Sequence, residues 1–346
     1  MELAHAHGAP PARGRIRTEP EDFLVEERLG FEPDGLGAHA LLVVEKRDAN
    51  TGWVAAQLAR LAGVHPRDVG YSGLKDRRAV TRQAYSLPWP ASRPPEEGLA
   101  FAGEGFRVLE AARHGRKLRP GSHRANRFTI RVRDLAGDPV AIDDRLRSIA
   151  AQGVPNYFGP QRFGRDGANL ARARRWADAG EAPRDRAQRG FALSAARSEL
   201  FNRVLEARVR RGDLDRLLPG EAVMLDGRRS FFAAPVIDAA LEERCRAMDV
   251  HPSGPLWGRG ESPATATASE VEDLVGASEP ALVALLGAQG LDHERRALRL
   301  PVRGLAWTQA EGALVLEFEL PRGTFATAVL HELLQEAWDP EEPGEE

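Results

Sequence analysis

Residues 70–83 constrain the fold of this chain most, because they predict two strands joined by a glycine-flanked bend. Residues 69–72 have the pattern of a short strand, and residues 79–87 alternate between apolar and polar side chains, as in a half-buried strand. The glycines of the bend permit backbone conformations that a Cβ would prevent. The only acidic side chain of the bend, Asp76, therefore lies at a connection between two strands, where functional residues are often found.

Asp76 is flanked by the cations Lys75, Arg77 and Arg78, and nearby positive charge favours the ionised form of a carboxylic acid. An ionised, positioned carboxylate can act as a nucleophile or as a base. The same pattern also fits an aspartate that bonds only its own backbone in a turn beside a solvated basic edge. The local sequence alone favours this second interpretation.

The length and composition of the chain limit its class. A chain of 346 residues exceeds what one hydrophobic core usually supports, so we expect two lobes or an insertion. The single cysteine, Cys245, excludes an intramolecular disulfide and a multi-cysteine zinc site, and is typical of a reducing cytosol. No segment approaches the roughly 20 apolar residues that span a bilayer, and the first residues do not resemble a signal peptide. We therefore expect a cytoplasmic protein.

The charges are unevenly distributed, although the formal net charge is only −3. Acidic residues are concentrated in the last eight positions and predict a disordered acidic tail over about 339–346. Residues 111–133 contain no acid and eight cations. Such a local excess of positive charge is what the phosphates of a nucleic acid attract.

The rest of the chain predicts a mixture of strands and helices, with an aromatic, glycine-rich and basic block at residues 154–164. Apolar periodicity predicts helices over residues 53–62, 141–152, 169–179, 194–211 and 323–335. Thr51 is the expected cap of the first of these helices, and Ser269 with Glu272 forms a predicted capping box. Residues 254–268 are rich in Gly, Pro, Ser and Thr, which predicts a loop.

Several familiar chemistries lack their motifs. The chain has no phosphate-binding Walker loop, no dinucleotide fingerprint and no nucleophile elbow. The nine histidines show no metal-ligand spacing, and His5 and His7 lie in an N-terminal segment that we expect to be floppy, so we predict no metal site. A conventional glycosidase would need a second carboxylate paired with Asp76, which the sequence does not identify. One carboxylate, many arginines and strand-borne aromatics suit chemistry on a flipped base of an RNA.

Six blocks in order along the chain resemble the TruD family of tRNA pseudouridine synthases. They are residues 20–23, residues 70–83, Asn126 with Phe128, and residues 154–164, 193–198 and 323–327. The resemblance implies a cofactor-free isomerase that converts uridine at position 13 of certain tRNAs to pseudouridine. It implies no obligate protein partner and a monomer.

The resemblance also implies an α+β fold of the pseudouridine synthase type, with a mixed, mainly antiparallel sheet and flanking helices. Residues 1–153 and 303–346 would form the discontinuous catalytic domain. Residues 154–302 would form a family-specific inserted α+β domain.

The resemblance assigns roles to individual residues. Asp76 would be the catalytic aspartate, Phe128 would stack on the target uracil, and Arg17 takes the place of a lysine in the family. Phe23 reads as a core residue by periodicity, whereas the resemblance places it in the substrate pocket. The residues expected to bind the substrate are Arg17, Phe23, Lys75, Gln83, Asn126, Phe128 and Phe325. The cations expected to bind RNA are Arg113, Arg116, Lys117, Arg119, Arg124 and Arg162.

Two other classes of function remain open from the sequence. One is a tRNA-binding or chaperone module that keeps this fold without catalysis, and the other is an N-glycosidase that releases the base. Tritium at C5 of the target uracil distinguishes them, because only formation of a carbon–carbon bond at C5 releases the label.

Overall fold

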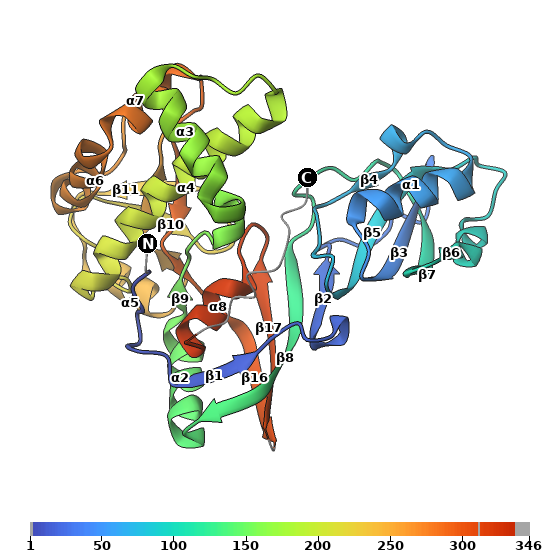
Figure 1. Ribbon diagram of the computed structural model, residues 1–346, viewed down its shortest axis with the longest axis horizontal. Helices are drawn as coiled ribbons and strands as arrows, with labels where there is room; N and C mark the ends of the chain where they lie inside the picture. Colours follow the sequence, from blue (N-terminus) through green and yellow to red (C-terminus); the bar gives the residue numbers. More distant parts are fainter. Residues whose placement is uncertain (1–2, 311, 336–346) are drawn as a thin grey trace.

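The structure, a computed structural model, describes residues 3–310 and 312–335, and this part of the chain contains one ten-stranded sheet with a second lobe beside it (Figure 1). The strand order is β16-β17-β8-β2-β5-β3-β7-β6, with β1 paired to β8 and β4 paired to β5. Strands β2 and β5 run parallel, and the other described neighbours in this sheet run antiparallel. The strands are β1 Ala12–Arg15, β2 Phe23–Arg28, β3 His39–Arg47, β4 Gly70–Tyr71, β5 Val80–Pro88, β6 Ala102–Gly103, β7 Phe106–His114, β8 Ala125–Gly137, β16 Arg303–Ala310 and β17 Ala313–Pro321.

Three helices pack on this sheet and form its two main cores. Helix α1 (Thr51–Ala62) buries Val54 and Leu58 against β3, β5 and β7. Helices α2 (Pro139–Gln152) and α8 (Ala326–Leu333) bury their apolar sides against β8 and β17. The predicted α+β class with a mainly antiparallel sheet and flanking helices is therefore confirmed.

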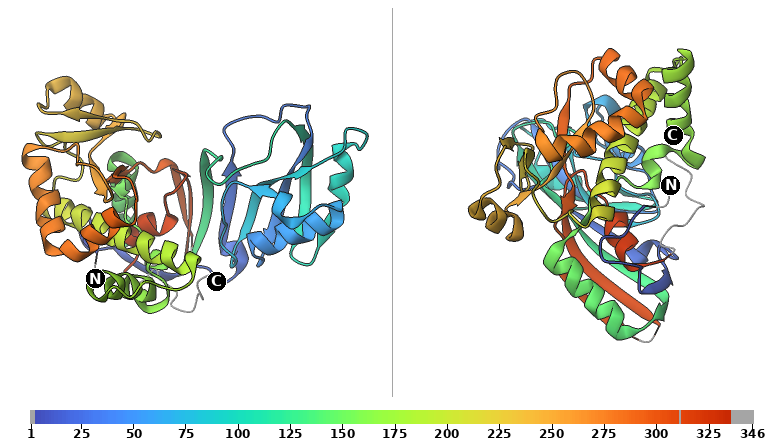
Figure 2. Two further views of the ribbon diagram at one scale, coloured as in Figure 1. Left: turned by 90° about the horizontal axis from the view of Figure 1, so that it is seen from above. Right: turned by 90° about the vertical axis from the view of Figure 1, so that its left-hand side faces the viewer.

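The second lobe, called the inserted lobe below, is formed by the chain between β9 (Val154–Pro155) and β15 (Arg299–Leu300). These two strands pair with each other. It lies on the opposite side of β8, β16 and β17 from helix α1 (Figure 2). Its helices are α3 Ala168–Ala179, α4 Arg186–Arg211, α5 Ala239–Arg246, α6 Ala266–Ser278 and α7 Pro280–Ala288. Its strands are β10 Glu221–Leu225, β11 Phe231–Ala234, β12 Val250–His251, β13 Ser253–Leu256 and β14 Glu294–Ala297. Short 3₁₀ helices in the chain are Pro20–Asp22, Pro66–Asp68, Pro95–Ala100, Pro160–Phe163 and Arg165–Gly167.

Helix capping differs from the sequence prediction at two positions. Asn50, not Thr51, is the N-cap residue of α1, and the Thr51 hydroxyl makes tertiary hydrogen bonds instead. Ser269 lies inside α6, which begins after Thr265, and the Glu272 carboxylate lies 2.7 Å from the Arg295 guanidinium. The Glu272 carboxylate therefore forms a buried ion pair instead of the predicted capping box.

Secondary structure differs from prediction in two places. Residues 253–256 of the predicted loop form strand β13, because β14 supplies a partner from far along the chain. Helix α4 begins at Arg186, eight residues before the predicted start, where Asp185 accepts a hydrogen bond from the Gln188 amide. The predicted acidic tail lies outside the described residues.

Candidate active site around Asp76

Asp76 lies in the loop between β4 and β5, and buried side chains hold the backbone of this loop. Lys46 is 1% exposed, and its Nζ donates to the carbonyl oxygens of Asp76 and Ala49, each at 2.7 Å. It also donates to the carbonyl oxygen of Lys75 at 3.3 Å. The scarcity of lysine in an arginine-rich chain is the one sequence signal that singles out Lys46.

Gln83 and Thr51 support the same loop from the side of the sheet. The Gln83 amide nitrogen donates to the carbonyl oxygen of Gly73 at 3.1 Å, and its amide oxygen accepts from the Thr51 hydroxyl at 3.0 Å. The Thr51 hydroxyl oxygen accepts from the Lys75 amide at 3.0 Å. Gln83 was expected to bind the substrate, but it is 1% exposed, and its side-chain oxygen and nitrogen both form hydrogen bonds with the protein itself.

The Asp76 carboxylate forms an ion pair with Arg17, from the segment between β1 and β2. Arg17 Nη2 lies 2.9 Å from Asp76 Oδ2, with the arginine side chain 6% exposed and the aspartate side chain 35% exposed. The Arg17 guanidinium also lies over the Phe23 ring, with its Cζ 4.2 Å from the ring centroid. One side of the carboxylate is thus fixed while the group remains accessible to a ligand.

Arg17 has a φ of +56°, in the left-handed region that residues other than glycine rarely occupy. Such backbone strain is concentrated at active sites and ligand-binding segments. The conformation is consistent with a residue that is placed by function rather than by local preference.

Lys75, the neighbour of Asp76 in sequence, is oriented differently from expectation. Its Nζ lies 2.7 Å from Oε2 of Glu27 on β2, and the two side chains are 5% and 1% exposed. The other oxygen of Glu27 accepts from the Ala84 amide at 3.2 Å. Lys75 therefore ties the loop to β2 through Glu27, and Arg17 supplies the guanidinium at the Asp76 carboxylate.

The aromatic residues predicted for the site lie on neighbouring strands and are packed against one another. Phe128 on β8 lies between Phe23 and Phe318, with ring centroids 6.0 Å and 5.4 Å away. Phe128 is 6% exposed and Phe23 is 1% exposed. The periodicity that places Phe23 in the core and the resemblance that places it beside the site are compatible, because Phe23 supports both Phe128 and Arg17.

Asn126, two residues before Phe128, lies beside His123. The Asn126 side-chain nitrogen is 3.5 Å from His123 Nε2, and the Asn126 side-chain oxygen has no hydrogen-bond partner among the described residues. His123 lies beside the loop of Asp76, because its Cε1 would be 3.5 Å from a Cβ placed on Gly73. Burial and the positive charge of Lys75 lower the pKa of His123. The sequence alone did not indicate His123.

Phe325 and Arg162 meet at the ring of Phe158, where the chain before α8 contacts the inserted lobe. Phe325, the N-cap residue of α8, packs against Phe158 at a centroid distance of 6.3 Å. The Arg162 Cζ lies 5.3 Å from the Phe158 ring centroid and 5.8 Å from that of Phe325. Burial lowers the pKa of Arg162.

The cations of the basic segment 111–133 fall into two groups, those bonded to backbone carbonyl oxygens and those without such a bond in the described part of the chain. The Arg113 guanidinium donates to the carbonyl oxygens of Trp89 and Pro90, at 3.0 and 2.7 Å, and Lys117 Nζ donates to that of Arg67 at 2.6 Å. These two side chains therefore fix neighbouring loops. The remaining predicted RNA-binding cations of the segment are exposed and form no ion pair with any described residue: Arg116, Arg119 and Arg124.

The N-terminal segment contacts α8, although the sequence suggested that it is floppy. Glu332 accepts hydrogen bonds from the amides of Ala6 and His7 at 2.8 and 3.1 Å. The rings of His5 and His331 stack with centroids 4.1 Å apart. Ligand atoms of His5, His331 and Glu332 lie within 4.8 Å of one another, but both oxygens of the carboxylate already accept amide hydrogens, so the cluster serves to fix the segment.

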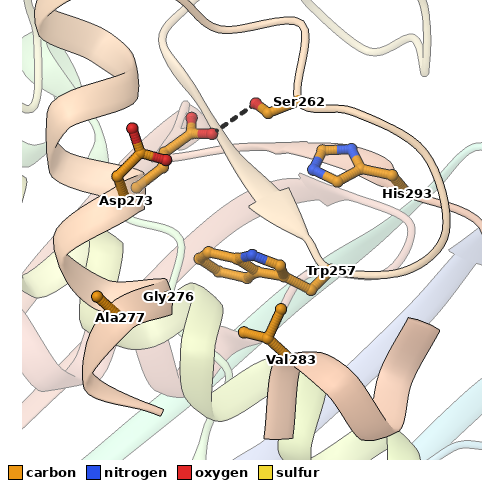
Figure 3. A pocket seen from close by; sticks show the side chains of 8 residues that line it. Trp257, Ser262, Asp273, Gly276, Ala277, Val283 and His293 are labelled. Atoms are coloured by element: carbon orange, nitrogen blue, oxygen red, sulfur yellow. Dashed lines mark hydrogen bonds between the residues drawn. The ribbon is translucent and has the colours of Figure 1, made fainter. Parts of the chain in front are cut away.

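A cavity of about 240 Å³ lies in the inserted lobe, between α6, α7 and the loop that follows β13 (Figure 3). Trp257 and His293 form part of its wall, and Ser262 donates to Glu272 at 2.7 Å. The lining residues belong to the inserted lobe, and the loop of Asp76 does not contribute to them. This cavity is therefore separate from the candidate active site.

Comparison with known proteins agrees with this architecture. A family model described as tRNA pseudouridine synthase D (TruD) matches residues 3–170 and 168–333. The chain is 47% identical over 335 residues to the tRNA pseudouridine synthase D of Nitrosococcus oceani, covering 96% of this chain and 94% of the relative. It is 48% identical over 330 residues to the protein of the same name from Azotobacter vinelandii, covering 95% and 93%.

A solved structure supports the fold. The crystal structure of a Methanosarcina mazei protein, described under the name tRNA pseudouridine synthase D, matches with a TM-score of 0.74 at 21% identity, covering 96% of each chain. The fold is therefore that of a pseudouridine synthase, as predicted. The chain belongs to the TruD family of tRNA pseudouridine synthases. Among residues 3–310 and 312–335, the helices are too short or too polar to cross a bilayer.

Proposed function

We propose that this protein isomerises a uridine of tRNA to pseudouridine, with position 13 as the expected target and Asp76 as the catalytic carboxylate. Family membership supports the reaction. The observation that carries the assignment of Asp76 is its carboxylate, 35% exposed and paired at 2.9 Å with the buried Arg17. A tRNA substrate is also consistent with the exposed cations of the segment 111–133.

The reaction requires cleavage of the bond between uracil N1 and ribose C1′, rotation of the uracil, and formation of a bond between C5 and C1′. A proton is then lost from C5 and one is taken up at N1, so that the product has the same atoms as the substrate. The Asp76 carboxylate acts on the nucleoside as a nucleophile or as a base. Arg17 keeps one carboxylate oxygen in place, which leaves the other available to the substrate.

The other predicted site residues fall into two groups. Phe128 and Asn126 remain candidates for contact with the flipped uracil, because they lie on β8 beside Phe23. Lys75 and Gln83 are buried and bonded to the chain, and we assign them to the positioning of the loop of Asp76. A cytoplasmic location and a monomeric state stay predictions.

The test uses a tRNA transcript labelled with tritium at uracil C5. The native protein should release one equivalent of label from the target uridine, and Asp76→Asn should release it at least about 10²-fold more slowly. Asp48→Asn, at an exposed aspartate in an ion pair with Arg77, is the matched control and should behave as the native protein does.

Each alternative function has its own outcome in this assay. Binding of the tRNA without release of label from the native protein would favour the non-catalytic module. Free uracil in the medium would identify an N-glycosidase. Release at the native rate by Asp76→Asn would remove Asp76 from the mechanism.

A further inference from the structure

Two arginines of the inserted lobe gather around one aromatic ring. Arg296 on β14 has its Cζ 4.2 Å from the centroid of the Phe158 ring, and Arg162 has its Cζ 5.3 Å from the same centroid. Arg162 also faces Phe325 at 5.8 Å. Arg162 belongs to the aromatic, basic block of residues 154–164, whereas no sequence pattern indicates Arg296.

Neither guanidinium has an ion pair with a carboxylate in the described residues. Burial, together with the positive charge of Arg162, lowers the pKa of Arg296, so the two cations repel each other. Two other buried arginines of the same lobe are neutralised: Arg208 lies 3.0 Å from Glu221, and Arg295 lies 2.7 Å from Glu272. Two like charges without a counter-charge, partly removed from water, are unfavourable unless an anion binds between them.

The chain positions these side chains without using all their donors. Arg296 donates from Nη1 to the Gly323 carbonyl at 2.9 Å and from Nη2 to the Asn156 side-chain oxygen at 2.5 Å. Arg162 donates from Nη1 to the Ser194 hydroxyl at 3.1 Å. A guanidinium has five N–H donors, so most of those of Arg162 are left for a ligand. The planar guanidinium group matches the geometry of a phosphate.

A hydrogen-bonded path joins this pair to the loop of Asp76. Gly323, which accepts from Arg296, follows Arg322, whose amide donates to the Arg124 carbonyl at 3.1 Å. Within the same segment, the Gly121 amide donates to the Ser72 carbonyl at 2.6 Å, and Ser72 lies in the chain just before the loop of Asp76. The basic segment thus bonds both to the chain beside Gly323 and to the chain just before the loop of Asp76.

We propose that Arg162 and Arg296 form a binding site for a backbone phosphate of the RNA substrate, with Phe158 and Phe325 as its aromatic floor. This inference rests on the proposed function, which supplies the RNA. Both arginines lie on the inserted lobe, whereas Asp76 lies in the loop between β4 and β5 of the large sheet. A substrate that reaches both therefore bridges the two lobes.

The test measures the affinity for a tRNA that carries a fluorophore at one end, between 50 and 200 mM KCl. It compares the native protein with Arg162→Met and Arg296→Met. Methionine keeps much of the packing against Phe158 while it removes the charge. Each variant should lower the slope of log affinity against log salt concentration by about 1, the loss of one phosphate contact. Arg229→Met, at the exposed turn between β10 and β11, is the matched control and should keep the native slope.

A second measurement separates a ligand role from a structural one. Inorganic phosphate should raise the melting temperature of the native protein more than that of Arg162→Met, with chloride at equal ionic strength as reference. Native salt slopes in both variants, or an equal effect of phosphate on native protein and Arg162→Met, would overturn the proposal. If Arg296→Met unfolds, Arg162→Met alone decides the question.

Tritium release by the native protein keeps this test distinct from that of the proposed function. Release by the native protein with unchanged salt slopes in the variants would overturn only the phosphate site. Absence of release from a bound tRNA would overturn the proposed function, while reduced slopes in the variants would still support the phosphate site.

Discussion

Lys75 Nζ lies 2.7 Å from Glu27 Oε2, and both side chains are almost fully buried beside the catalytic loop. The pair joins the residue that precedes Asp76 to strand β2, 48 residues earlier in the chain. A buried ion pair of this kind orders a loop even where it adds little net stability, because loss of one partner leaves the other charge buried.

Replacement of Lys75 by methionine should therefore destabilise the fold by about 3–5 kcal/mol, since the Glu27 carboxylate would remain buried without its cation. Lys75→Met combined with Glu27→Gln should recover most of this loss, because the glutamine oxygen can still accept from the Ala84 amide. Urea unfolding measures both. A single variant as stable as the native protein would contradict the prediction, and a stable but inactive double variant would show that the pair is needed for activity beyond its contribution to stability.

Arg17→Lys should lower kcat by about 10–100-fold and change KM little, because a lysine keeps the charge but not the planar group that lies between Phe23 and the Asp76 carboxylate. Single-turnover tritium release measures the chemical step. Arg15→Lys, at an exposed ion pair with Asp134 two residues earlier, is the control. Equal rates for Arg17→Lys and the native protein would show that the geometry at Asp76 does not depend on this guanidinium.

Replacement of the exposed cations Arg116, Arg119 and Arg124 by glutamine should make tRNA binding less sensitive to salt. The slope of log affinity against log salt concentration should fall by up to about 3. Each lacks an ion pair among the described residues, so the fold should not depend on it. Fluorescence anisotropy across KCl concentrations measures the slope. Arg60→Gln on α1 is the control, and an unchanged slope in the triple variant would mean that the segment faces away from RNA.

Stability should fall between pH 6.5 and about 4, in part because of His331. Burial and the neighbouring His5 lower the pKa of His331 to about 4, whereas the unfolded chain takes up the proton near pH 6.5. Protons therefore bind the unfolded state first as the pH falls, and this one group removes up to about 3 kcal/mol.

His331→Phe should reduce that loss, because phenylalanine can keep the contacts with the rings of His5 and Tyr157 without binding a proton. Urea unfolding at pH 7.5 and pH 4.5 measures the difference. The groups that face His331 include His5 and the carboxylate of Glu332, so His5→Phe should be measured beside it. A pH dependence equal to that of the native protein would assign the acid sensitivity to other titratable groups.

The sequence predicts the local part of this site and not its long-range part. Strand alternation and the glycine bend place Asp76 correctly at a connection between β4 and β5. Arg17 as its partner requires a left-handed backbone that no pattern signals, and Lys75 pairs with Glu27 only because β2 and β5 are adjacent and parallel. Charge counting along the chain cannot predict which neighbour an aspartate selects in space.

The partners of the arginines are also distant in sequence, so local patterns do not predict them. The acid-free segment is visible in the sequence, but the structure shows that Arg113 and Lys117 donate hydrogen bonds to backbone carbonyl oxygens of the described residues, unlike Arg116, Arg119 and Arg124. Arg296 approaches Arg162 only after the 133 intervening residues have folded into the second lobe. The resemblance to a family supplied the roles that local patterns left open.

The pairing of β9 with β15 has a consequence for how such proteins diversify. The chain enters and leaves the second lobe through these two adjacent strands, whose backbones are about 5 Å apart. A segment of any length that starts and ends at neighbouring positions can be exchanged with little disturbance of the framework that carries it. Substrate choice can thus evolve on one module while the catalytic sheet and its aspartate are inherited unchanged.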